Sequence, residues 1–251
     1  MEAKRKLGEV LSAFEFLDNQ SMDMVLNHLE GVRNPFPPSL HNFYVLIETT
    51  GSNETHDKEK LEAFLLGSME SGLISDGVVA QDINQASSFW RIREVIYRIL
   101  YISIEMGVTE ALMKAGAIYK YDLSLPVEKM YIIVEKMRAR LGQTAKVLGY
   151  GHLGDANLHL NISVPQYDDT ILAQIEPFVY EWTSNHRGSI SAEHGLGLMK
   201  ANEIHYSKTP ETLSIGVCFD QVQLMASIKK LFDPSGILNP YKVIPQTLLQ
   251  G

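Results

Sequence analysis

The spacing of apolar and polar residues changes along the chain between the period of a helix and that of a strand. The first 35 residues have a helical pattern, which a proline-rich stretch ends. Segments rich in β-branched and aromatic residues predict strands at 41–51, 77–80, 119–126, 146–152, 157–164 and 188–192. Segments of helical period predict helices at 57–72, from about 82, at 127–142 and at about 168–185. The residues 231–245 follow a last helix as an extended tail.

The order of these elements predicts an α+β fold. Strands and helices alternate, and consecutive strands lie close enough in the sequence to form hairpins. We therefore expect an antiparallel or mixed sheet with helices packed on one face, in a single domain that covers 1–251. Within it, residues 1–35 form a helical lead-in.

Composition excludes several functional classes. The chain has 251 residues, a hydrophobic fraction of 45% and a formal net charge of -8, so neither nucleic acid nor an anionic membrane is expected as a partner. Its one cysteine, Cys218, rules out a disulfide framework and a cysteine-rich zinc site. No apolar run has the length of a transmembrane segment, and no targeting peptide is visible.

The densest group of polar residues lies in GYGHLGDANLHLN, at 149–161. In a strand over 157–164, His159 and Asn161 share one face, and Leu158, Leu160 and Ile162 face the core on the other. His152 lies seven residues before His159, an offset that would place the two on opposite faces of one regular strand. A turn at Gly154 would bring the two imidazoles together instead.

A second group, SAEHGLG at 191–197, contains Glu193 and His194. Two histidines and one carboxylate form a normal site for a catalytic divalent metal, and His152, His159 and Glu193 would fit it. His194 would then remain available as a base. Taken singly, such histidines are more often surface or hydrogen-bonded residues, and an EHG sequence is typical of a turn.

Three basic residues have two interpretations. Arg91 and Arg93 lie on the predicted helix, and Lys120 lies on the strand 119–126. The more common role of such residues is as solvated surface charge. The alternative is a clamp for carboxylates, for which the planar guanidinium is well suited.

Longer motifs show a resemblance to a known family. These motifs, in chain order, are FYVLIETTGSNETHDKEKLEAFL, WRIRE, GVTEALMKAGAIYKYDLSLP, GHLGDANLHLN, PFVYEWT, SAEHGLG and DPSGILNPYK. They cover nearly the whole chain and resemble the C-terminal region of the FAD-linked oxidase family, to which flavin-linked D-2-hydroxyacid dehydrogenases belong. Within this family the chain is more similar to the hydroxyglutarate branch than to the lactate branch. The resemblance implies a ferredoxin-like cap domain.

The resemblance also implies roles for individual residues. The residues that match metal ligands, usually of zinc, are His152, His159 and Glu193. The residues that match substrate-binding positions are Arg93, Thr109, Lys120, Asn161 and His194. Asn239 matches a segment that folds back toward the flavin domain.

The chemistry that the resemblance implies is oxidation of a D-2-hydroxy acid to a 2-oxo acid. FAD accepts the hydride, a metal acidifies the hydroxyl, and His194 accepts its proton. The family further implies electron-transferring flavoprotein as the acceptor and the mitochondrial matrix as the location, and a homodimer stays open. Two alternatives remain: an enzyme for lactate or another 2-hydroxy acid, and a catalytically silent metal-binding module.

The chain departs from the family pattern in two ways. No glycine-rich loop for a dinucleotide pyrophosphate is present, so the FAD-binding domain is expected to be missing. Two segments, 95–106 and 213–221, are predicted to be insertions. On a continuous helix the first would place Arg93 and Thr109 about 160° and about 24 Å apart, too far to contact one substrate.

Overall fold

The computed structural model divides the chain into two compact units. It describes residues 2–28, 32–36, 41–105, 116–208, 211–212, 218–219 and 221–249. Unit 1 comprises Met1–Tyr119, Gln143–Asp155 and His159–Tyr167. Unit 2 comprises Lys120–Gly142, Ala156–Leu158 and Asp168–Gly251.

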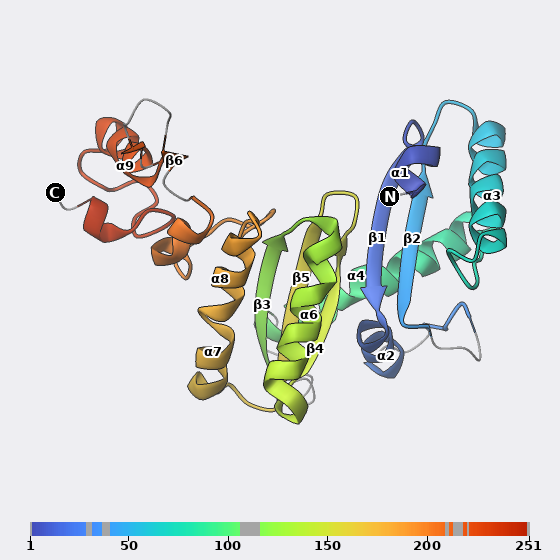
Figure 1. The fold of residues 1–251 in the computed structure, drawn as a ribbon, viewed down its shortest axis with the longest axis horizontal. Helices are drawn as coiled ribbons and strands as arrows, with labels where there is room; N and C mark the ends of the chain where they lie inside the picture. Colours follow the sequence, from blue (N-terminus) through green and yellow to red (C-terminus); the bar gives the residue numbers. More distant parts are fainter. Residues whose placement is uncertain are drawn as a thin grey trace. The chain divides into compact units, whose positions relative to one another are not determined.

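The main sheet has five strands in the order β2-β1-β4-β5-β3 (Figure 1). The strands are β1 (Leu11–Asp18), β2 (Phe43–Thr49), β3 (Ala117–Ser124), β4 (Lys146–His152) and β5 (Asn157–Val164). β1 pairs antiparallel with both β2 and β4. The predicted α+β class is thereby confirmed.

The helical lead-in predicted for residues 1–35 is wrong. A short helix α1 (Glu2–Leu7) ends at a turn, and the chain then enters β1 before the helix α2 (Asn19–His28) begins. The segment LSAFEFLD favours a strand because its two phenylalanines alternate with polar or small residues. Hydrogen bonding to a neighbour on each side then makes β1 an interior strand of the sheet.

The hairpin of β4 and β5 forms as predicted. The inward side chains of β5, Leu158, Leu160 and Ile162, are fully buried. Ala156 has a φ of 56° in the turn between the strands, and the N–H of Gly154 donates to the carbonyl of Phe14 in β1. The turn is therefore tied to the neighbouring strand, and the ends of β4 and β5 are held in place.

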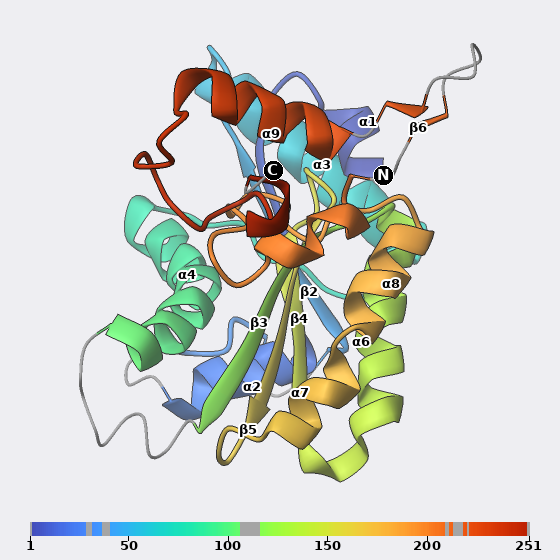
Figure 2. The ribbon, with the colours of Figure 1, turned by 90° about the vertical axis from the view of Figure 1, so that its left-hand side faces the viewer.

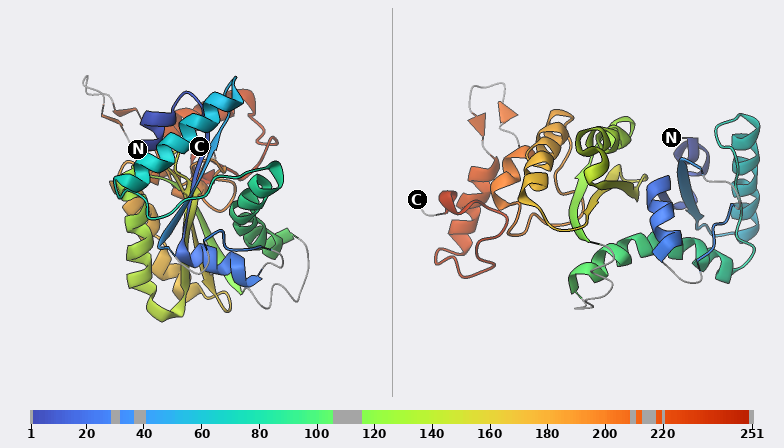
Figure 3. Two further views of the ribbon diagram at one scale, coloured as in Figure 1. Left: turned by 90° about the vertical axis from the view of Figure 1, so that its right-hand side faces the viewer. Right: turned by 90° about the horizontal axis from the view of Figure 1, so that it is seen from below.

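The described residues of unit 1 form four helices, of which α2 and α4 pack together and against strands of the sheet (Figure 3). Its longer helices are α3 (Glu54–Glu70) and α4 (Ile83–Glu105). Asp18 at the end of β1 accepts one hydrogen bond from the N–H of Ser21 and another from the N–H of Gly149. One buried carboxylate thus caps α2 and joins that helix to β4.

The predicted insertion 95–106 continues α4, whose backbone is helical to Glu105. Thr109 lies outside the described residues, so its predicted separation from Arg93 stays a prediction. In the second predicted insertion, the strand β7 (Cys218–Phe219) pairs with β6 (Glu211–Thr212), and Gln221 begins a helix. Residues 213–217 and 220 lie outside the described residues.

Unit 2 contains the helices α6, α7 and α8, each packed against the next in the chain (Figure 2). Their bounds are α6 (Val127–Leu141), α7 (Asp169–Ile175) and α8 (Phe178–Asn185). As predicted, Pro126 precedes the first residue of α6 and Gly142 follows its last. Gly142 has a φ of 55°. None of the described helices combines the length and the apolar character needed to cross a bilayer.

Three further predictions of secondary structure are wrong. The single helix expected at 168–185 is divided into α7 and α8 by Pro177, because a proline inside a helix removes an N–H and clashes with the preceding turn. Residues 77–80 have no regular structure. The strand expected at 188–192 is reduced to one bridge, between Ser189 and Ser124 at the end of β3.

The tail after α9 (Gln221–Phe232) is anchored by Asp233. Its carboxylate accepts hydrogen bonds from the N–H groups of Ile237 and Leu238, and it pairs with Lys229. The lysine and these N–H groups hold the pKa of Asp233 below its ordinary value. The stabilising effect is therefore present at neutral pH and is lost as the pH falls through the folded-state pKa.

We expect Asp233→Asn to loosen this tail without unfolding unit 2. The neutral amide keeps one acceptor oxygen but loses the ion pair with Lys229. Hydrogen exchange at Ile237 and Leu238, corrected for intrinsic rates, should become several times faster, while exchange in α6 stays unchanged. Equal protection of Ile237 and Leu238 in both proteins would contradict the anchoring role of Asp233.

Candidate functional site

His152 and His159 face each other across the β4–β5 hairpin. Their ring centroids are 5.3 Å apart, and the rings are nearly perpendicular. His159 is buried in the middle of β5 and also contacts the ring of Tyr150, whereas His152 at the end of β4 is about one-third exposed. The prediction that the hairpin turn brings the two imidazoles together is confirmed.

A buried carboxylate binds His152 from the side of β1. Glu15 lies directly opposite His152 in the pairing of β1 with β4, and its carboxylate oxygens are 2.9 Å and 3.0 Å from Nδ1 of the histidine. Nε and Nη2 of Arg93 both lie 2.9 Å from the same carboxylate. The guanidinium also lies over the ring of Tyr150. These residues form a compact polar cluster within unit 1.

The segment that carries Glu193 and His194 has no regular secondary structure, and buried groups of unit 2 hold its backbone. One carboxylate oxygen of Asp122, on β3, accepts hydrogen bonds from both N–H groups, at 2.9 Å and 2.8 Å. The carbonyl of Asp122 accepts a third, from Ala192. The ammonium of Lys200 donates to the carbonyl of Ile190.

The two side chains of this segment are nevertheless accessible. Glu193 and His194 are 46% and 51% exposed, and the Nε2 atom of His194 lies 3.7 Å from the Glu193 carboxylate. A firmly held backbone with exposed ionisable side chains is typical of a binding site, because orientation is fixed before the ligand arrives.

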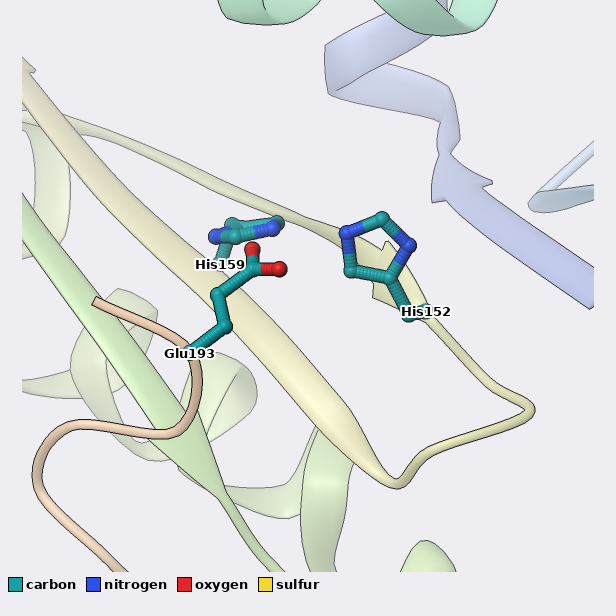
Figure 4. Close-up of side chains that lie close together, drawn as sticks. All are labelled: His152, His159 and Glu193. Atoms are coloured by element: carbon teal, nitrogen blue, oxygen red, sulfur yellow. The ribbon is translucent and has the colours of Figure 1, made fainter.

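Ligand atoms of His152, His159 and Glu193 all lie within 4.8 Å of one another (Figure 4). The Glu193 carboxylate points toward the two imidazole rings. Two ligands at about 2.1 Å from one ion are about 3.4 Å apart in tetrahedral geometry, so shifts of about 1 Å would form a site. Imidazole nitrogen and carboxylate oxygen are donors that Zn²⁺ accepts, and a three-ligand set leaves room for a substrate or water. The donor set therefore fits a catalytic divalent metal.

The remaining predicted site residues have different surroundings. Asn161 is buried on β5, two residues beyond His159 and on the same side of the strand. Lys120 is half-buried on β3, and burial lowers the pKa of its ammonium. Asn239 is exposed in the tail of unit 2, with a φ of 47°. Thr109 lies outside the described residues, and the guanidinium of Arg93 is bound to Glu15.

Two residues of this region had not been singled out from the sequence, Glu15 and Asp122. Each is a carboxylate within an apolar strand, in FEFLD and YKYDLS respectively, and each is buried. A buried carboxylate needs partners to offset its desolvation, so a charge inside an apolar strand is a usable signal. Because the sequence pattern predicts a helix over residues 11–18, Glu15 does not stand out there as a charge inside an apolar strand.

Comparison with known proteins extends over the whole chain. Residues 1–243 match the family described as FAD linked oxidases, C-terminal domain. A mitochondrial D-2-hydroxyglutarate dehydrogenase of Arabidopsis thaliana is 70% identical over 251 residues, which are 100% of this chain and 41% of the relative. The protein of that name from Danio rerio is 52% identical over 96% of this chain and 41% of its own length.

A third relative, from Schizosaccharomyces pombe, is named as a putative mitochondrial D-lactate dehydrogenase. It is 43% identical over 97% of this chain and 44% of its own length. The chain thus spans about two-fifths of the length of the relatives it matches. The match over residues 1–243 shows that this chain belongs to the FAD-linked oxidase family, as a C-terminal domain.

Proposed function

We propose that this chain is the substrate-binding part of a mitochondrial FAD-dependent dehydrogenase that oxidises (R)-2-hydroxyglutarate to 2-oxoglutarate. The observation that carries the proposal is the convergence of His152, His159 and Glu193. It occurs in a chain that is 70% identical along its whole length to a protein named D-2-hydroxyglutarate dehydrogenase.

The two histidines and Glu193 would hold the metal, with zinc as the leading candidate. A divalent ion at this position supplies a Lewis acid that lowers the pKa of the substrate hydroxyl. The hairpin fixes the two imidazoles, and Asp122 fixes the backbone of Glu193. Both ligand segments are therefore oriented before any ligand binds, which reduces the entropic cost of assembling the site.

His194 would accept the proton of the substrate hydroxyl as general base. The backbone N–H of His194 donates to the carboxylate of Asp122. The half-exposed imidazole of His194 would reach a substrate bound at the neighbouring Glu193. The Glu193 carboxylate, 3.7 Å from Nε2, would stabilise the imidazolium after proton transfer.

The basic and amide side chains would recognise a substrate with two carboxylates. Arg93 and Lys120 provide cations, and burial leaves the Lys120 ammonium less solvated and so better able to bind an anion. Asn161 would donate a hydrogen bond from the same face of β5 as His159. Thr109 is assigned to the substrate by resemblance alone.

The hydride from C2 of the substrate would pass to FAD, which is the electron carrier of the family. We propose that the segment around Asn239 meets a flavin-binding part of the protein; the chain matches 41% of the relative from Arabidopsis thaliana, which leaves room for such a part. Electron-transferring flavoprotein in the mitochondrial matrix is the proposed acceptor, and a homodimer is the proposed assembly. The sequence similarity to relatives named as mitochondrial supports a mitochondrial location.

A second candidate function is oxidation of D-lactate, favoured by the 43% identical relative from Schizosaccharomyces pombe. Lactate has one carboxylate, so only one of the two proposed cations would contact a substrate carboxylate. The substrate profile separates the two functions.

The test uses a chimera in which this chain replaces the matched part of the Arabidopsis thaliana protein. After loading with FAD and Zn²⁺, we expect dye reduction with (R)-2-hydroxyglutarate. Its kcat/KM should exceed that for D-lactate by about 100-fold or more, because a missing polar partner is strongly discriminated. Reduction with D-lactate at equal or higher kcat/KM would support the second function. Bound flavin and metal without reduction by either acid would indicate a catalytically silent module.

A further inference from the structure

Glu15 contacts His152, a proposed metal ligand, and Arg93, a proposed substrate-binding residue, although Glu15 itself has neither role. Its side chain is only 8% exposed and joins Nδ1 of His152 to the guanidinium of Arg93. All three residues belong to unit 1. The backbone enforces this arrangement, because Glu15 and His152 are directly paired across β1 and β4.

The direction of these contacts assigns a proton. The carboxylate is an acceptor only, so the His152 nitrogen that faces it must carry the hydrogen. In a neutral imidazole the other nitrogen, Nε2, then keeps its lone pair, and Nη2 of Arg93 lies 3.5 Å from this atom. Nε2 is therefore the atom of His152 that can bind a cation.

We propose that Glu15 is the positioning residue of the metal site, which fixes the tautomer and ring orientation of His152 for metal binding through Nε2. The inference rests on the proposed metal site. Arg93 lies 2.9 Å from the same carboxylate and supplies the cation that pairs with it.

A purely structural role would be an ion pair between Glu15 and Arg93 that only stabilises the sheet. The two roles differ in which residue matters. Glu15→Gln and Arg93→Gln both break the ion pair, but only the first removes the charge from His152. If Glu15 acts only through the ion pair, the two substitutions should change every property to a similar extent.

The experiment measures Zn²⁺ affinity of the 251-residue chain by competition with a chromophoric chelator. It also records the visible spectrum of the Co²⁺-loaded chain. We expect Glu15→Gln to weaken Zn²⁺ binding about tenfold or more, in the range of outer-shell substitutions, and to alter the Co²⁺ spectrum. Arg93→Gln should weaken it less than about threefold, and Glu48→Gln, at an exposed position of β2, should have no effect.

Glu15→Gln leaves the Arg93 cation buried without its partner, so this protein is at risk of unfolding. The double variant Glu15→Gln/Arg93→Gln removes both charges, and it should fold and still bind Zn²⁺ about tenfold more weakly. Equal affinity of this double variant and Arg93→Gln would overturn the role of Glu15. Absence of Zn²⁺ binding in the unchanged chain would instead overturn the proposed metal site itself.

Discussion

Replacing His159 with alanine should remove tight Zn²⁺ binding from this chain. His159 is the most deeply buried residue of the three, and on β5 its ring contacts those of Tyr150 and His152. A water molecule in the space left by the imidazole would be a weaker ligand than a nitrogen atom that the strand holds in place. Loss of an outer-shell partner alone weakens metal sites by about 10–100-fold, so loss of a direct ligand should exceed about 100-fold.

The measurement is a Zn²⁺ titration of the unchanged chain and of three variants. His159→Ala tests the buried ligand, and Glu193→Gln tests a ligand whose half-exposed side chain can be changed without disturbing the core. His205→Ala replaces an exposed histidine of unit 2 as the control. Stoichiometric binding with unchanged affinity in both His159→Ala and Glu193→Gln would exclude the proposed site.

The sequence predicted the part of the site that depends on local geometry. The alternation in NLHLNI places Leu158 and Leu160 in the core and His159 on the other face, and the structure has this arrangement. The turn around Gly154 determines where His152 lies, and a turn is a short-range feature. Pro126 and Gly142 likewise set the ends of α6 through their own backbone preferences.

The features that could not be predicted depend on contacts between distant segments. β1 is a strand because β2 and β4 satisfy its hydrogen bonds, and both follow it in the sequence by more than 20 residues. The residues 188–192 have a strand-like composition, yet among the described residues of this segment only Ser189 forms a β-bridge. The division of the predicted helix 168–185 at Pro177, in contrast, could have been predicted, because a proline in a helical pattern ends or kinks the helix.

Replacing Asp122 with alanine should weaken Zn²⁺ binding by about 10–100-fold, although Asp122 is not a predicted ligand. Its carboxylate accepts hydrogen bonds from the backbone N–H groups of Glu193 and His194. Each hydrogen bond to a charged acceptor contributes about 1.5–3 kcal/mol to stability. A loss of 1.4 kcal/mol in the positioning of Glu193 corresponds to a factor of ten in affinity. Alanine removes both bonds at once and frees a segment that has no regular secondary structure.

Asp122→Asn separates the hydrogen bonds from the charge. Its amide oxygen can still accept both N–H groups, while its nitrogen takes the place of the second carboxylate oxygen. That oxygen is buried and has no hydrogen-bond partner among the described residues, so the exchange removes no bond there. We therefore expect Asp122→Asn to retain Zn²⁺ affinity within about tenfold.

Hydrogen exchange at residues 192–194 provides the readout that links Asp122 to this segment. Exchange should become faster in Asp122→Ala and remain close to normal in Asp122→Asn, while exposed Asp169→Asn serves as the unaffected control. If Asp122→Ala leaves both the exchange at 192–194 and the Zn²⁺ affinity unchanged, other contacts hold Glu193. In that case the next candidates for holding the segment are the hydrogen bonds from Lys200 to Ile190 and from Ile190 to Ser207. Ile190 directly follows Ser189, the residue that bridges to the end of β3.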